Sequence, residues 1–416
     1  MGPITIFDKS FLQSLSLDEA VLFDHFFLSN ICPIYFLETL ADLKKIVKSG
    51  RSPEKEVSIL AAKTPQHGKP NMFHTEIYTG NLLGYEVPMT LGQIVVKGGK
   101  PVKTPDQTGI IYEPSPEEEA LSRWQDGKFF EVEQTFAKNW RFALKSMSFK
   151  RVIKNLKKVG LRPKECRTLE QSKHMAESLV SQSRLSVEHT HLLFDLLNLP
   201  SDIEGKVLQN WRKDLCPPLI KFAPYAAYFL IVELFFFIAA AANQISQEKV
   251  TNKIDLAYIY YLPFAMLFVS SDKFHRRCVP LFLRENQRFI WGPDLKDDLK
   301  NLDQYYSILS EREREKGLSA IASRPPNDDR YLVTRLWKQF LRKDLFSEPP
   351  SSVPRGESAK TLVDHLEKIA NAKSLRPDEI DFDLSDTDAM VIKRKIRAKR
   401  GKYWLIPKDV AIKNKG

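Results

Sequence analysis

Residues 254–280 constrain the fold of this chain more than any other stretch, because an apolar helix and an apolar strand follow each other there. Residues 256–262 are too continuously apolar for a surface helix, and residues 265–269 form the short apolar run that is typical of a buried parallel strand. Asp255 opens the helix and Asp272 follows the strand. Reacting groups in an open parallel sheet gather just beyond the carboxyl ends of the strands, so we expect Asp272 to lie at such an end.

The N-terminal residues predict a matching half of the same sheet. Residues 4–7 are β-branched and aromatic, as in a strand, and the run stops at Asp8. Residues 31–37 form a second apolar run that ends at Glu38, and an amphipathic helix over residues 18–28 joins the two runs. A strand, a helix and a second strand in this order give a right-handed crossover, which predicts Asp8 and Glu38 at the same edge of the sheet.

Four acids and two serines thus follow the predicted strands or open the predicted helix in a fixed order: Asp8 with Ser10, Glu38, Asp255, and Ser270 with Asp272. This order resembles the PIN-domain family of metal-dependent nucleases, with a long insertion between the second and third acids. Residues 273–277 contain no acid, where some relatives carry a further one. The resemblance therefore implies a minimal set of ligands.

The resemblance implies a catalytic site that binds one or two Mg²⁺ or Mn²⁺ ions, directly or through water. Carboxylates suit these ions, which prefer oxygen ligands, and such an ion supports phosphodiester hydrolysis by activating water and neutralising charge on phosphate oxygens. The expected ligands are Asp8, Glu38, Asp255 and Asp272, with Ser10 and Ser270 orienting carboxylates or waters. The alternative is that Asp8 and Asp255 are helix N-caps and that Glu38 and Asp272 are loop acids.

The net charge of +11 and the pI near 9.2 predict a polyanionic partner, and nucleic acid fits better than a membrane. Much of the basic charge lies between residues 139 and 173, where Trp140, Phe142 and Phe149 are interleaved. Such a stripe can track a phosphate backbone, although a solvated helix face is the alternative. The predicted nucleic-acid-binding residues are Arg141, Lys145, Lys150, Arg151, Lys154, Lys157, Lys158, Arg276 and Arg277.

Residues 222–242 form the most apolar run and are long enough to span a membrane. Glu233 stands near the middle, where a charge would be costly in a bilayer. We therefore predict a core helix and no membrane span. Glu233 either supports the metal site from behind its ligands or is a buried carboxylate with its own partners.

The predicted architecture is an α/β fold with a parallel-sheet PIN-like core, a large, mainly helical insertion and a C-terminal extension. The core comprises residues 1–50 and 217–300, and the insertion comprises residues 51–216, with an irregular hairpin around residues 86–96 followed by basic helices. The extension, residues 301–416, contains an acidic block at 378–388 and a basic block at 393–402. These blocks either pair with each other, which we favour, or grip RNA.

We therefore expect a metal-dependent nuclease, with RNA as the substrate that the family resemblance implies. The alternatives are a non-catalytic nucleic-acid-binding or scaffold protein with the same fold, and a structure-specific DNA nuclease. A protein partner that restrains the activity is a further possibility in such families. Four scattered cysteines and the lack of a leader with a cleavage site indicate a cytoplasmic protein.

Overall fold

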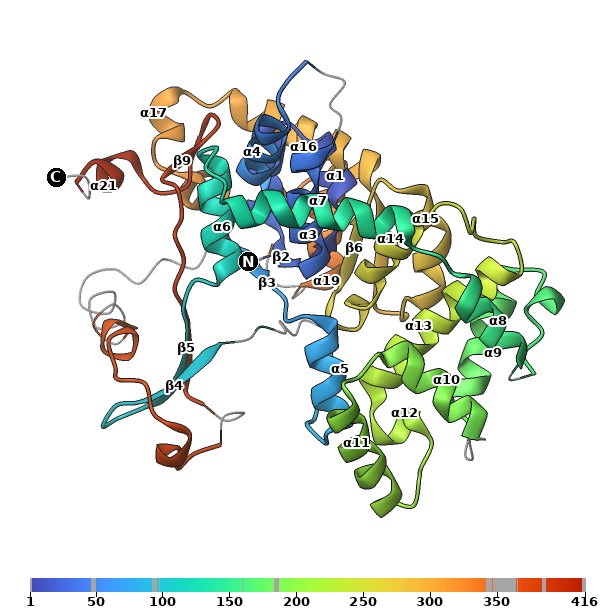
Figure 1. The fold of residues 1–416 in the computed structure, drawn as a ribbon. Helices are drawn as coiled ribbons and strands as arrows, with labels where there is room; N and C mark the ends of the chain where they lie inside the picture. Colours follow the sequence, from blue (N-terminus) through green and yellow to red (C-terminus); the bar gives the residue numbers. More distant parts are fainter. Residues whose placement is uncertain are drawn as a thin grey trace.

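The computed structural model describes residues 2–45, 50–91, 96, 98–158, 160–182, 187–341, 346, 364, 366–383 and 387–413. At its centre is a five-stranded parallel sheet with the strand order β3-β2-β1-β6-β7 (Figure 1). The strands are β1 (Ile4–Phe7), β2 (Leu28–Ile31), β3 (Lys69–Pro70), β6 (Leu267–Ser270) and β7 (Arg288–Trp291). The predicted α/β class with a parallel sheet is confirmed.

Two strands that are far apart in the sequence lie side by side in the sheet. Strand β1 pairs with β6, with Phe7 opposite Val269, and the backbone N–H of Asp8 donates to the carbonyl of Val269 at 3.1 Å. Every residue of β1 and β6 is buried, which requires that helices cover both faces of the sheet. One group of contacting helices is α2 (Leu17–Phe26), α4 (Pro53–Lys63) and α16 (Gly292–Ser307), and another is α13 (Pro224–Ala241), α14 (Thr251–Ile259) and α15 (Lys273–Cys278).

The strand order reverses between β1 and β6. From β1 the chain adds β2 and then β3 on one side, and from β6 it adds β7 on the other. The carboxyl ends of β1 and β6 therefore mark the topological switch point of the sheet, the position next to which ligands bind in open α/β folds.

The predicted second strand is wrong in its position. Strand β2 ends at Ile31, and Pro33 starts the helix α3 (Pro33–Ala41), so Glu38 lies in a helix and not at a strand end. Proline suits the first turn of a helix, because its φ is already helical and its missing N–H would have no partner there. Asp255 likewise lies inside α14, which begins at Thr251, and does not open the helix.

The most apolar run forms α13, and 16 of its residues are buried. It is the one helix in the described part of the chain that is long and apolar enough to cross a membrane, and most of it is buried inside the protein. The carboxylate of Glu233 is hydrogen-bonded to Lys253 and to the hydroxyl of Tyr260. Glu233 is thus a buried carboxylate with partners of its own.

The segment between β3 and α13 is mainly helical, and its helices α8 to α12 gather away from the sheet at the lower right of Figure 1. Its helices are α5 (His74–Leu82), α6 (Pro116–Gln125), α7 (Glu131–Ser146), α8 (Lys150–Lys158), α9 (Leu169–Val180), α10 (Val187–Leu197), α11 (Ser201–Lys213) and α12 (Leu219–Phe222). Later in the chain come α17 (Glu311–Arg314), α18 (Leu318–Ile321), α19 (Leu332–Phe340) and α21 (Lys408–Lys413).

The hairpin lies later in the chain than predicted. Residues 86–91 form no strand, and residues 92–95 and 97 lie outside the described residues. The hairpin consists of β4 (Gly99–Lys103) and β5 (Thr108–Tyr112), and the C-terminal strand β8 (Ala389–Ile392) adds to it beside β5.

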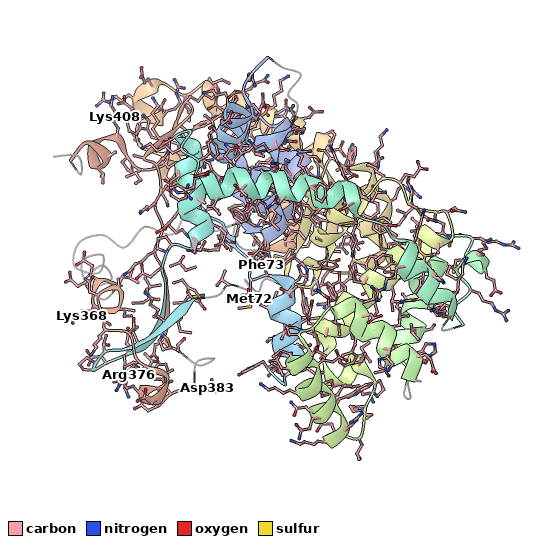
Figure 2. All side chains as sticks on the ribbon, viewed as in Figure 1. Met72, Phe73, Lys368, Arg376, Asp383 and Lys408 are labelled. Carbon is pink, nitrogen blue, oxygen red and sulfur yellow. The ribbon has the colours of Figure 1, made fainter. Side chains whose placement is uncertain are left out.

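The described ion pairs of the two charged blocks run to other segments of the chain or to the neighbouring Arg376, and none of these pairs joins one block to the other. Asp381 pairs with Lys103 of the hairpin, and the residues around Arg376 and Asp383 lie beside that hairpin (Figure 2). Basic residues of the tail, which includes β9 (Lys399–Arg400) and β10 (Tyr403–Trp404), pair with acids of the domain. These pairs are Lys393–Glu113, Arg397–Asp126, Arg400–Asp24, Lys402–Asp303 and Lys408–Glu315.

The pair between Arg400 and Asp24 fastens the tail to the core. The two side chains are 3% and 1% exposed and 2.6 Å apart, and Arg400 also donates to the carbonyls of Ala62 and Thr64. Burial alone would raise the pKa of Asp24, but the contacts with His67 and the charge of Arg400 lower it to about 2. The tail is therefore held by a buried ion pair.

We predict that Arg400→Ala will destabilise the protein by about 3–5 kcal/mol, because it leaves the buried charge of Asp24 unpaired. The matched control is Arg397→Ala, since Arg397 and Asp126 are about half exposed. This control is expected to cost less than about 1 kcal/mol. Urea unfolding of the three proteins measures both values, and equal losses would contradict the assigned role of Arg400.

The low pKa of Asp24 predicts a dependence of stability on pH. Because folding lowers this pKa from 3.8 to about 2, the carboxylate stabilises the fold above its unfolded pKa, and this stabilisation is lost as the pH falls through about 2. The difference in the free energy of unfolding between wild type and Asp24→Asn should therefore fall by about 2 kcal/mol between about pH 5 and pH 2. Unfolding free energies across that range test this, and a constant difference would contradict it.

Candidate active site

Asp8 lies at the switch point, directly after β1, and caps the helix α1 (Lys9–Ser14). Its Oδ1 accepts a hydrogen bond from the backbone N–H of Phe11 at 2.9 Å. Its Oδ2 accepts from the hydroxyls of Ser10 at 2.5 Å and Ser270 at 2.8 Å. The carboxylate of Asp8 is thus buried and held in one orientation by partners on α1 and at the end of β6.

Asp272 follows the neighbouring strand β6 and caps α15. Its Oδ1 accepts from the backbone N–H of Phe274 at 2.6 Å, and its own N–H donates to the hydroxyl of Ser270 at 2.9 Å. One side chain, that of Ser270, therefore connects the two predicted acids that follow adjacent strands.

A buried histidine completes this network. Nδ1 of His275 lies 2.8 Å from Oγ of Ser270, and Nε2 lies 2.7 Å from the carbonyl oxygen of Asp255. The single hydroxyl proton of Ser270 is donated to Asp8, and a carbonyl can only accept, so both ring nitrogens of His275 must donate. The hydrogen bonds thus require a positively charged imidazolium with no exposure to solvent.

The charges around His275 agree with that assignment. Burial alone would lower the pKa of His275, but Asp8, whose Oδ2 lies 3.6 Å from Nδ1, and Asp255 outweigh burial and raise this pKa to about 9. In turn, burial alone would raise the pKa of Asp8, but His275 lowers it. The two groups form an internal ion pair at the switch point.

The other two acids reach this region from helices. Oε2 of Glu38 accepts from the hydroxyl of Tyr258 at 2.6 Å, and Lys9 donates to the carbonyl of Glu38 at 2.9 Å. Burial raises the pKa of Glu38. The pKa of Asp255 is raised to about 7, mainly by burial; His275 opposes the rise, and the charges of Glu38, Asp272 and Asp8 add to it. The four acids thus lie close enough to interact electrostatically.

The structure brings together Asp8, Ser10, Ser270 and Asp272 through hydrogen bonds, and links Glu38 and Asp255 to them through the helices α3 and α14. As for the alternative assignment, Asp8 and Asp272 do cap helices, whereas Glu38 and Asp255 lie inside helices. The sequence prediction missed three residues that organise the site, namely Lys9, Tyr258 and His275. Each lies within three residues of a predicted acid, which was the available signal.

The donor atoms of the site are of the type that a hard divalent cation prefers, but they are not arranged in a metal-binding geometry. The donors are carboxylate oxygens, which suit Mg²⁺ or Mn²⁺. Among the residues that the structure describes, no group of three or more His, Cys, Asp or Glu side chains has the geometry of a metal site.

Of the predicted nucleic-acid-binding residues, two donate side-chain hydrogen bonds within the protein and the others are exposed. Arg141 is tied to Asp42 at 3.1 Å and to the carbonyl of Ala41, and Arg277 donates to the carbonyl of Gln244. Arg276 is exposed, and its guanidinium lies 4.8 Å from the ring centre of Trp291. The remaining residues are exposed on α7 and α8: Lys145, Lys150, Arg151, Lys154, Lys157 and Lys158.

Comparison with family models, with curated proteins and with solved structures found no match to this chain. The resemblance to PIN domains therefore depends on the order of the acids and serines along the chain.

We predict that Ser270→Ala will destabilise the protein by about 1–3 kcal/mol, because the N–H of Asp272 and the ring of His275 lose their buried partner. The matched control is Ser14→Ala, since the hydroxyl of Ser14 makes one hydrogen bond, to the carbonyl of Phe11, at a partly buried position. Urea unfolding should show a smaller loss for the control. Equal losses would mean that the Ser270 hydroxyl does not organise the site.

Proposed function

We propose that this protein is a metal-dependent nuclease that hydrolyses phosphodiester bonds at the switch point of its sheet, with RNA as the expected substrate. The observation that carries the proposal is the connection of Asp8 to Asp272 through Ser270 at the carboxyl ends of β1 and β6. Glu38 and Asp255 act electrostatically on the same place from α3 and α14. Four carboxylates at a ligand-binding edge are a suitable donor set for a hard cation.

In the proposed site, Asp8, Glu38, Asp255 and Asp272 would hold Mg²⁺ or Mn²⁺. The bound ion would supply an activated water and neutralise charge on the phosphate oxygens. Ser10 and Ser270 keep the carboxylate of Asp8 in a fixed orientation. His275 holds the backbone of α14 against the end of β6, which positions Asp255 beside the other acids.

Arg276 is the residue in the best position to hold a substrate phosphate. It follows Asp272 by one helical turn, and its exposed guanidinium lies over Trp291. Trp291 is in register with Ser270 across the β6–β7 pair, so this guanidinium stands at the same edge of the sheet as the acids. An arginine that stacks on an aromatic ring keeps its donors oriented for a phosphate.

A second candidate function is a non-catalytic nucleic-acid-binding or scaffold protein. The observation that favours it is the internal cation His275 beside Asp8, which already offsets one of the acids. The described residues also lack a preformed metal geometry. In such a protein the acids and His275 would stabilise the sheet edge, and the basic helices would carry the function.

We predict that Asp272→Asn will lower metal-dependent cleavage by orders of magnitude while the protein stays folded. The amide keeps the size of the side chain and still accepts the hydrogen bond from Phe274, but it loses the charge that holds a hard cation. Asp8→Asn should act likewise, and the two losses should not add, because both acids serve one site. The assay is cleavage of single-stranded RNA with Mg²⁺ or Mn²⁺.

The matched control is Asp297→Asn, which changes an exposed acid on α16 outside the hydrogen-bonded network. It is expected to keep full activity. Thermal unfolding of each variant separates loss of chemistry from loss of fold. Full cleavage by both folded single variants would reject the nuclease proposal and leave the binding-protein function.

A further inference from the structure

Phe142 is a large aromatic side chain on the outside of the protein. It lies on α7 and is 75% exposed, whereas Ala137 on the same helix is fully buried. Lys138 and Lys145, four residues before and three residues after Phe142, are also exposed and share its side of the helix. An exposed ring between two lysines offers a flat apolar surface flanked by positive charge.

The same part of the chain carries an excess of positive charge. Residues 138–173 contain twelve Lys and Arg but two acids, Glu165 and Glu170, while the whole chain has a net charge of +11. Five of these basic residues lie on α8, which buries Leu156 and packs against α13, so its basic side faces outward. They are Lys150, Arg151, Lys154, Lys157 and Lys158, and within the described residues none of them forms an ion pair.

This basic surface is connected to the proposed active site. Helix α7 crosses α3, the helix that carries Glu38 (Figure 1). Arg141, next to Phe142, pairs with Asp42 at 3.1 Å, and Asp42 pairs with Lys9 at 2.7 Å. Lys9 in turn donates to the carbonyl of Glu38. A chain of direct contacts thus fixes α7 relative to the acids.

We infer that the outward faces of α7 and α8 bind a single strand of nucleic acid, with Phe142 stacking on one base and the lysines and arginines following the phosphates. A ring can stack on an unpaired base, whereas in a duplex both faces of each base are already covered by neighbouring bases. The charge of the surface is complementary to a phosphodiester backbone. That an unpaired strand is also the substrate rests on the proposed nuclease function. The binding of an unpaired strand does not depend on that function.

The test is fluorescence anisotropy of the full chain in EDTA, which keeps the probe intact. The probes are a labelled single-stranded RNA of about 20 nucleotides, a single-stranded DNA of the same sequence, and the RNA duplex, since sites of this kind cover roughly 4–16 nucleotides. We predict that Phe142→Ala will weaken binding of a single strand roughly 5- to 150-fold, with little change for the duplex. Phe142→Trp should retain the affinity, because it keeps a ring.

The salt dependence separates stacking from charge. Phe142→Ala should leave the slope of log affinity against log salt unchanged, because no cation is removed. A variant with Lys150, Lys154 and Lys157 changed to Gln should lower that slope by about 1 for each lost phosphate contact. A slope unchanged in this triple variant would overturn the role of α8.

The matched control for the ring is Val132→Ala, since Val132 is 70% exposed on α7. It should bind single strands as wild type does. Equal losses in both variants would show that the ring of Phe142 has no stacking role and would overturn the inference, as would unchanged binding in Phe142→Ala or no binding by wild type. If wild type cleaves nothing with Mg²⁺ but Phe142→Ala still loses single-strand binding, the inference stands and the nuclease proposal fails.

Discussion

The parallel pairing of β1 with β6 is the constraint on which the rest of the structure depends. It places Asp8 beside Ser270, which is 262 residues away in the sequence, and both strands are fully buried. Closing so long a loop costs conformational entropy, although this cost grows slowly with loop length. The burial of two apolar strands offsets it, and the hydrogen bond from Ser270 to Asp8 joins their carboxyl ends. Asp8, Ser270 and Asp272 are positioned at the ends of this pair of strands, and Glu38 and Asp255 reach them from α3 and α14.

The site places negatively and positively charged side chains together in a largely buried region. Four carboxylates would repel one another, and the rise in the pKa of Asp255 to about 7 is a sign of that repulsion as well as of burial. His275 and Lys9 provide the compensating positive charges within the protein. A buried cation with two hydrogen bonds can stabilise such a cluster where an unpaired one could not. The positive charge of His275 also weakens the attraction of the four acids for a metal ion. His275 therefore affects both the stability of the sheet edge and the proposed binding of Mg²⁺ or Mn²⁺.

The sequence predicted the parts of this structure that depend on local patterns. The runs before Asp8 and Asp272 are short, apolar and followed by a capping acid, and both are strands. Glu38 was misplaced because the apolar residues before it suit a buried helix as well as a strand, and Pro33 starts the helix. His275 could not be identified as a cation from the sequence, because its charge follows from the tertiary positions of Ser270 and the carbonyl of Asp255. The partners of the tail are equally non-local, as for Arg400 and Asp24.

The chain contains two strongly basic segments, and the structure uses them in opposite ways. In the tail, basic residues pair with acids elsewhere in the chain: Arg400 with Asp24, Lys402 with Asp303 and Lys408, which is labelled in Figure 2, with Glu315. Their charge is neutralised within the protein and fastens the tail in place. On α8 the basic residues are exposed, while Leu156 is buried and the helix packs against α13. The exposed cations of α8 therefore remain available to a polyanion, whereas the paired cations of the tail are already engaged within the protein.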